Sequence, residues 1–344
     1  MTTEPNTDLP ELARIAGSKA LEAWNLKAER LELISQGENL VYQLDATNGE
    51  RYALRVHRPG YHTVPALESE QLWTSALNDA GILVPIGQPR VDGGYYESIP
   101  VCNDKDIRQI GLVAWLDGKS LHEIVSEGED PGLLLNSMKE TGRIAGLIHN
   151  HSSKWQIPAN FVRHELDAEG FMGESPFWGP FWSLPELSPG QRELFLSVKQ
   201  ALFNYLSDLN KSPEIYGMLH ADLHGGNLLV SEQGITVIDF DDAGYGWHPY
   251  ELAVVLHHLQ EHKDFASIYR HLIEGYRSVR PITQSQLDQI PVFLLIRTLA
   301  SIGWCHARRE FDRSDYLVAL IERGTRQSQL FLSNQLGKMF KEKL

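Results

Sequence analysis

Acidic and amide side chains gather in one stretch of the chain, residues 216–242. The side chains in it that are candidates to bind a metal ion are Asp222, Asn227, Asp239 and Asp241. Carboxylate and amide oxygens suit a hard cation such as Mg²⁺ better than zinc or copper. In phosphoryl transfer, Mg²⁺ neutralises the phosphates while a carboxylate orients and deprotonates the attacking hydroxyl. This stretch contains residue types for both tasks.

A predicted hairpin brings these side chains together. Two apolar runs, residues 228–230 and 235–238, flank a short polar turn that contains a glycine, which is typical of paired strands. Pairing about position 233 sets Asn227 beside Asp239 at the open end of the hairpin. The glycine-containing loop before it lets Asp222 reach the same end.

Residues 220–227, followed by 238–241, resemble the signature of the aminoglycoside phosphotransferase and choline kinase group. That group has the protein-kinase-like fold and acts on small molecules. The resemblance implies that Asp222 is the catalytic base and that Asn227 and Asp239 are Mg²⁺ ligands. The cluster of side-chain oxygens itself offers Asp241 as a further metal contact.

Two other interpretations of this motif stay open. Asp and Asn are common in glycine-containing turns without any catalytic role. His220, Asp222 and His224 also alternate like the ligands of a binuclear metallohydrolase, which would bring zinc or manganese chemistry. That site needs further histidines and gives Asn227 and the hairpin no role.

The first part of the chain predicts an antiparallel meander of strands over residues 30–35, 40–46 and 51–57. The turn between the first two strands occupies the place of a kinase phosphate-covering loop, where backbone N–H groups meet the nucleotide. Its residues are Gly37, Glu38 and Asn39. An ordinary hairpin turn is the alternative, because the loop has a single glycine.

Arg55 lies in the third strand, where kinases usually present a lysine to the nucleotide phosphates. Arginine keeps the charge and grips phosphate in a fork, but it is not a neutral replacement. By the same resemblance, Glu70 in a predicted helix over residues 64–80 pairs with Arg55. An exposed strand residue and a solvated helix face are the alternatives.

Strands are predicted over residues 86–91 and 95–101. In the kinase-like fold that the resemblance implies, the apolar run over residues 110–116 is the edge strand and hinge. The backbone groups expected to read adenine belong to Val113, Ala114, Trp115 and Leu116. We therefore expect an α+β, two-lobed protein-kinase-like fold: an N-terminal nucleotide-binding lobe of residues 1–115, and a mainly helical catalytic and substrate-binding lobe of residues 116–344.

The second lobe contains a segment rich in aromatic residues and proline, residues 151–190. Aromatic walls with interspersed acids would suit a small amine or amino-alcohol, although packing against the helices is the alternative for each aromatic residue. Only a short segment separates Asp239 from the helix that follows it. A regulated protein kinase needs a longer peptide-docking segment there, which favours a small acceptor.

Composition narrows the function classes. A net charge of −14 over 344 residues argues against general binding to nucleic acid or to an anionic membrane. Cys102 and Cys305 are too few for a disulfide framework, which indicates a reduced, cytoplasmic protein. We expect no apolar run of membrane-spanning length.

The sequence thus predicts a phosphotransferase that uses ATP and Mg²⁺ to phosphorylate a hydroxyl of a small-molecule acceptor. Relatives phosphorylate homoserine, choline-like amino-alcohols, sugars and aminoglycosides, and the sequence does not choose among these. Two rivals remain: a bacterial Ser/Thr protein kinase of the same fold, and a non-catalytic nucleotide-binding protein, suggested by Arg55 in place of lysine.

Overall fold

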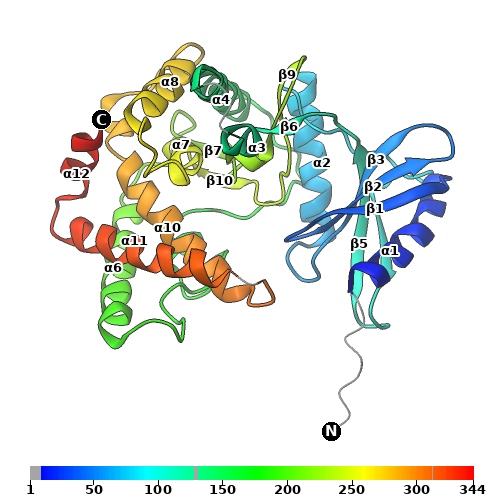
Figure 1. Ribbon diagram of the computed structural model, residues 1–344, viewed down its shortest axis with the longest axis horizontal. Coiled ribbons are helices and arrows are strands. Elements are labelled where there is room, and N and C mark those ends of the chain that lie inside the picture. Colours follow the sequence, from blue (N-terminus) through cyan, green and yellow to red (C-terminus); the bar gives the residue numbers. More distant parts are fainter. Residues whose placement is uncertain (1–8, 128–130, 312) are drawn as a thin grey trace, which may run out of the picture. The chain divides into compact units, whose positions relative to one another are not determined.

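A computed structural model describes residues 9–127, 131–311 and 313–344 (Figure 1). By internal contacts the chain divides into two compact units. Of the described residues, unit 1 holds those up to Gly118 together with Ile157–Val162, and unit 2 holds those of Lys119–Gln156 and Arg163–Leu344. The predicted lobe boundary after residue 115 lies just before the first of these divisions. No local sequence pattern marks Ile157–Val162 as part of unit 1.

Unit 1 is built on a five-stranded antiparallel sheet with the strand order β1-β2-β3-β5-β4. Its elements are α1 (Leu9–Ala20), η1 (Leu21–Trp24), β1 (Ala28–Gln36), β2 (Leu40–Ala46), β3 (Arg51–Val56), α2 (Val64–Asp79), β4 (Tyr96–Pro100) and β5 (Ile107–Ala114). Small residues of α1 pack against this sheet, and Gly17 of α1 lies close to the Leu54 side chain. The predicted meander is therefore present. The run predicted as an edge strand instead belongs to β5, which pairs with β3 on one side and β4 on the other.

The strand predicted over residues 86–91 is wrong. Only a single bridge forms there, between Gly87 and Val113, beside the hydrogen bonds that Ile86 and Gln88 make to β5. Pro85 and Pro89 flank this stretch. Proline has no backbone N–H to donate to a neighbouring strand. These two prolines therefore limit the stretch to isolated contacts with the sheet.

Unit 2 is mainly helical. Its elements are β6 (Lys119–Ser120), α3 (Leu121–Ser126), α4 (Pro131–Ser152), α5 (Ala168–Met172), α6 (Pro189–Ser207), β7 (Tyr216–Leu219), η2 (Gly225–Asn227), β8 (Leu228–Ser231), β9 (Gly234–Val237), β10 (Gly244–Trp247), α7 (His248–His257), α8 (Phe265–Arg277), α9 (Gln284–Leu287), α10 (Ile290–Ala307), α11 (Ser314–Leu332) and α12 (Leu336–Lys343). A sheet unit joined to a helical unit confirms the predicted α+β class.

Glycines bring two helices of unit 2, α4 and α8, into close contact (Figure 1). A β-carbon added at Gly275 of α8 would lie 1.7 Å from the carbonyl oxygen of Lys139 in α4, and one added at Gly142 would lie 2.0 Å from that of Leu272. Both distances are far below van der Waals contact. Glycine is therefore required at these two positions for the helices to cross as closely as they do.

One stretch of the described residues, Gln284–Ala307, is long and apolar enough to cross a membrane, so the expectation that no run reaches this length was wrong. However, 67% of its most apolar window is buried within the protein. It includes α10, which packs against α7 and α11. Core helices of non-membrane proteins have the same length and composition, and the burial favours that role for α10.

Candidate active site

The loop between β7 and β8 carries Asp222, and a hairpin of β8 and β9 follows it. Leu228 pairs with Val237, and the Ile238 N–H donates to the Asn227 carbonyl oxygen at 3.0 Å. The predicted hairpin is present, but its register is shifted. Asn227 lies opposite Ile238, so Asp239 follows one residue beyond the pair rather than facing Asn227.

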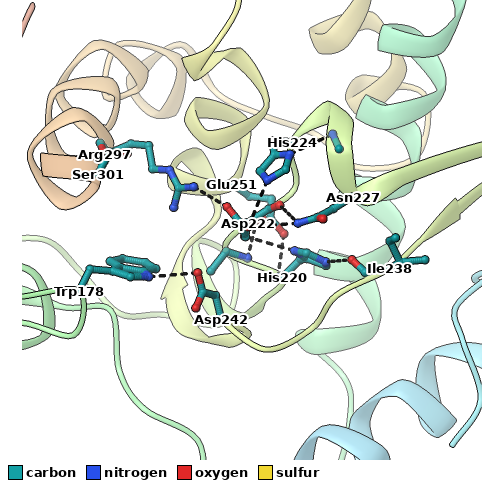
Figure 2. A network of polar contacts seen from close by, with 12 residues as sticks. Trp178, His220, Asp222, His224, Asn227, Ile238, Asp242, Glu251, Arg297 and Ser301 are labelled. Carbon is teal, nitrogen blue, oxygen red and sulfur yellow. Dashed lines mark hydrogen bonds and ion pairs between the residues drawn. The ribbon is translucent and has the colours of Figure 1, made fainter. Parts of the chain in front are cut away.

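Three side chains surround the Asp222 carboxylate (Figure 2). The Asn227 amide nitrogen donates to Oδ2 at 3.1 Å and to the Asp222 carbonyl oxygen at 2.9 Å. His224 Nε2 lies 3.3 Å from Oδ2. On the other side, an Arg297 terminal nitrogen from α10 donates to Oδ1. Both carboxylate oxygens are thus held, which fixes the direction of the carboxylate.

The charges around Asp222 keep it ionised. Burial raises the pKa of Asp222, but His224 and Arg297 lower it by more, so its pKa is well below the ordinary range. Burial lowers the pKa of His224, but the Asp222 carboxylate raises it by more, so the pKa of His224 lies above its ordinary value. Asp222 is therefore in its charged form near neutral pH, the form that accepts a hydrogen bond from a hydroxyl.

Glu251 of α7 holds the backbone before Asp222. Its fully buried carboxylate accepts the His220 N–H at 2.9 Å and the Ala221 N–H at 2.8 Å. Ala221 has a φ of 66°, a left-handed conformation that costs a non-glycine residue about 1 kcal/mol or more. Burial raises the pKa of Glu251 to about 7, although the two N–H groups lower it. The role of Glu251 had no assignment from the sequence.

The His220 ring forms hydrogen bonds to the backbone of the Asp222 loop and of the hairpin. Its Nδ1 accepts the Asp222 N–H at 3.2 Å, and its Nε2 lies 2.9 Å from the Ile238 carbonyl oxygen. Because a carbonyl only accepts, Nε2 carries the proton. His220 therefore ties the Asp222 loop to the end of the hairpin and is not available as a metal ligand in this arrangement.

The predicted metal ligands are brought together only in part. Among the described residues, no group of three or more His, Cys, Asp and Glu side chains is arranged to hold a metal ion, so the carboxylates of Asp222, Asp239 and Asp241 do not form one cage. Asp241 is 4% exposed, and Asp239 is exposed with a left-handed φ of 64°. The Asn227 Oδ1 has no hydrogen-bond partner among the described residues.

An amide oxygen and a carboxylate at the hairpin end fit a hard divalent cation whose remaining ligands are phosphate and water oxygens. Soft metals prefer thiolate and imidazole, and the two cysteines of the chain, Cys102 and Cys305, are free and lie outside this loop. The donor set therefore suits Mg²⁺ or Ca²⁺ better than zinc.

The ion pair predicted in unit 1 is present. Arg55 Nη1 in β3 donates to Glu70 Oε1 in α2 at 3.0 Å, and the side chains are 11% and 2% exposed. The Thr63 hydroxyl caps the first turn of α2, and Pro65 follows within that turn. Removing one partner of such a buried pair typically costs about 3–5 kcal/mol.

The loop between β1 and β2 is held by its own side chains. Asn39 Oδ1 accepts the Arg58 N–H at 3.3 Å, and Glu38 Oε1 lies 3.6 Å from Arg58 Nε. The Gly37 N–H donates to the Asn39 carbonyl oxygen at 3.1 Å. A β-carbon added at Gly37 would meet open space. The chain itself therefore does not require glycine at this position.

The hinge amides are partly used by the chain. The Ala114 N–H donates to the Ile86 carbonyl oxygen at 3.0 Å and the Trp115 N–H to that of Arg51 at 3.1 Å. The Leu116 N–H has no partner among the described residues. Of the predicted adenine-reading stretch Val113–Leu116, Leu116 is thus better placed to donate to a ligand than Ala114 or Trp115.

The aromatic segment of unit 2 reaches the same loop region. Trp178, which is buried, donates its indole N–H to Asp242 Oδ2 at 3.0 Å (Figure 2). The Arg297 guanidinium carbon lies 5.6 Å from the centre of the Trp178 ring. An arginine over an aromatic face is attracted to it. Trp178 therefore contacts both Arg297 and the segment that follows Asp239.

Sequence reasoning missed Arg297, and it gave Glu251 no role. Arg297 is the only Lys, Arg, Asp or Glu in α10, a helix of mostly buried apolar residues. A lone charge in a buried helix needs a partner, and this was a usable signal for Arg297. Glu251 offered no comparable signal because it lies in the first turn of α7, where acids are common in any helix.

A sequence model for a protein family described as "phosphotransferase enzyme family" matches residues 30–284. Among curated proteins, the amicoumacin kinase of Bacillus subtilis (strain 168) is 25% identical over 300 residues, covering 84% of this chain and 83% of the relative. The homoserine kinase of Rhizobium johnstonii is 24% identical over 221 residues, covering 63% and 61%.

Solved structures with a similar fold are also small-molecule kinases by their names. A microcompartment-associated aminopropanol kinase has a TM-score of 0.80 and 27% identity, covering 94% of this chain and 98% of that one. An amicoumacin kinase in complex with AMP-PNP, Ca²⁺ and Ami has a TM-score of 0.74 and 21% identity, covering 90% and 92%. The predicted protein-kinase-like, two-lobed fold class is confirmed.

Proposed function

The chain belongs to the phosphotransferase enzyme family, and from that membership we propose that it transfers the γ-phosphate of ATP to a hydroxyl group of a small molecule bearing an amine. Asp222 is the base in this proposal. Arg55, braced by Glu70, holds nucleotide phosphates, and the backbone near Gly37 and Leu116 contacts the nucleotide.

The observation that carries the proposal is the restrained, ionised carboxylate of Asp222. Asn227 and Arg297 hold its two oxygens, and Glu251 holds the backbone before it. Phosphoryl transfer asks little covalent work of the protein, because orientation and charge neutralisation provide most of the rate enhancement. A fixed carboxylate that accepts the proton of an acceptor hydroxyl fits that requirement.

A divalent cation completes the proposal. Asn227 Oδ1 and the Asp239 carboxylate would hold it, and the chemistry it supplies is neutralisation of phosphate charge. A relative of the same fold binds AMP-PNP with Ca²⁺, which supports a nucleotide and a divalent ion. We propose Mg²⁺ as the working ion, because Mg²⁺ is the usual partner of substrate phosphates at such sites.

The names of the relatives support an amine-bearing acceptor. An aminopropanol kinase, at 27% identity over nearly the whole chain, phosphorylates a small amino-alcohol by its name. The net charge of −14 also favours a cationic acceptor over an anionic one. The segment between Asp239 and α7 holds the short strand β10 and leaves little chain for docking a peptide, which speaks against a protein kinase.

The test is ADP release from Mg·ATP with a panel of acceptors, using Asp222→Asn as the blank. The panel pairs 3-aminopropan-1-ol with homoserine, which differ only by a carboxylate, and adds ethanolamine, choline, a sugar and an aminoglycoside. We expect release above the blank with at least one amine-bearing alcohol. ADP release with the sugar alone would contradict the proposal that the acceptor bears an amine. Phosphorylation of a protein substrate, with none of the small molecules accepted, would contradict the proposal of a small-molecule acceptor.

A further inference from the structure

Arg163 binds the loop that follows Asp239. Its Nε donates to the Ala243 carbonyl oxygen at 2.5 Å, and one terminal nitrogen donates to the carbonyl oxygens of Phe240 at 3.1 Å and Asp241 at 2.5 Å. Arg163 is 8% exposed. One buried guanidinium thus satisfies three carbonyls of a four-residue loop. Charged donors make stronger hydrogen bonds than neutral ones, so this contact restrains the loop.

The residues after Arg163 continue the contact. The Leu166 N–H donates to the Tyr245 carbonyl oxygen at 2.6 Å, and the Tyr245 N–H donates to that of His164 at 3.0 Å. His164 Nε2 also lies 3.1 Å from the Asp242 carbonyl oxygen. The chain from Arg163 to Leu166 therefore runs beside residues 240–245 and holds them by backbone and side-chain bonds.

The residue before Arg163 is bound within unit 1. The Val162 N–H donates to Ser69 Oγ at 2.8 Å. Ser69 lies in α2, is buried, and donates its own hydroxyl proton to the Pro65 carbonyl oxygen at 2.7 Å. Its neighbour Glu70 forms the ion pair with Arg55. The peptide bond between Val162 and Arg163 therefore joins a residue anchored beside that ion pair to a residue anchored on the loop after Asp239.

We propose that residues 157–163 form a strap that couples the Arg55–Glu70 pair to the loop after Asp239, with Arg163 as the positioning residue of that loop. This inference rests on the proposed function, in which Arg55 meets nucleotide phosphates and Asp239 meets the cation. Asp239 has a left-handed φ of 64°, a conformation that persists only when surrounding bonds enforce it. Ordering at either end of the strap then favours ordering at the other, and such coupling is reciprocal.

The plain alternative is that Arg163 only satisfies buried carbonyls and that Ser69 only satisfies the Val162 N–H. In that case the two contacts act independently. Coupling instead predicts that cutting the Ser69 anchor loosens residues 240–246, which Ser69 does not touch, and that this effect disappears once Arg163 has been removed. A double-mutant cycle separates the two cases.

The variants are Ser69→Ala, Arg163→Met, Arg163→Lys and the double variant Ser69→Ala/Arg163→Met. The matched control is Arg192→Met, because Arg192 also donates to two backbone carbonyls, those of Trp182 and Leu184, each at 2.8 Å. Two readouts are used on each full-length variant. One is amide hydrogen exchange of residues 240–246 without nucleotide or metal, and the other is the Mg²⁺ concentration that gives half-maximal AMP-PNP binding.

For Arg163→Met we expect faster exchange in residues 240–246 and a rise of about tenfold in the Mg²⁺ requirement. Arg163→Lys restores part of both, and Ser69→Ala gives a smaller change of the same sign, about threefold. The double variant matches Arg163→Met, and Arg192→Met matches the wild type. Additive effects, or unchanged exchange in Ser69→Ala, would overturn the strap. If the wild type binds no AMP-PNP, the proposed function fails, while the exchange data still decide on the strap.

Discussion

The Asp222 carboxylate and the Asp239 carboxylate have different surroundings, which suggests different tasks. Asp222 is held by Asn227, His224 and Arg297, whereas Asp239 is exposed at the end of the hairpin.

We expect Asp222→Asn to lower kcat by about 10²–10⁴-fold, the usual contribution of a general base, with unchanged AMP-PNP affinity. Asp239→Asn is expected to weaken Mg²⁺-dependent AMP-PNP binding as well. Titration calorimetry with and without Mg²⁺ separates the two, and equal loss of affinity in both variants would contradict these roles.

Burial raises the pKa of Asp222, whereas His224 and Arg297 lower it by more. We therefore expect Arg297 to contribute to the acid limit of activity. Because the working form is the carboxylate, activity in the wild type persists as the pH falls toward the lowered pKa. Arg297→Met leaves the burial and removes the charge, so the pKa of Asp222 rises and the acid limb of the kcat profile moves to higher pH.

Arg297→Lys serves as the matched control for that profile, since it keeps a positive charge on α10. Its acid limb is expected to lie between those of the wild type and Arg297→Met. The measurement is kcat from pH 4 to pH 9 at saturating ATP. The same acid limb in all three proteins would show that Arg297 does not control the ionisation of Asp222.

At the scale of the elements, local patterns predicted most of the fold. The hairpin turn, the meander and the helix predicted over residues 64–80 follow from periodicity and turn residues. The failures are those in which distant segments decide. Arg163 and Glu251 act on loops that are far from them in sequence, and no local pattern announces such a contact. The register of the hairpin shifted by one residue because its turn could be closed in more than one way.

The crossing of α4 and α8 depends on glycine. We expect Gly275→Ala to lower the free energy of unfolding by about 1–3 kcal/mol or more, because its β-carbon would overlap the Lys139 carbonyl oxygen. Gly337→Ala in α12 is the matched control, since a β-carbon there meets nothing within 4 Å. Alanine favours a helix, so this control is expected to be neutral or stabilising by up to about 1 kcal/mol. Urea unfolding of both variants checks the difference, and equal stability would mean that the helices separate at no cost.

At the scale of the whole molecule, each unit carries residues that we propose as nucleotide contacts. Unit 1 contributes the buried Arg55–Glu70 pair, and unit 2 contributes Asn227 and Asp239. A ligand that binds only the folded chain raises its stability by an amount set by its concentration and affinity, about 2.7 kcal/mol at 100 times Kd. The gain in stability on adding nucleotide can therefore be compared between variants that each change one residue, in unit 1 or in unit 2.

We expect AMP-PNP with Mg²⁺ to raise the melting temperature of the wild type, and a chelator to remove most of that increase because phosphate charge is then no longer neutralised. Arg55→Met is expected to reduce the increase with and without metal, since it removes a phosphate contact and leaves the Glu70 carboxylate buried without this partner. Asp239→Asn should behave in the chelator like the wild type and respond little to added Mg²⁺. Ca²⁺ is the matched ion, because oxygen ligands accept both. An increase that is unaffected by the chelator in the wild type would contradict a metal-dependent nucleotide site on this chain.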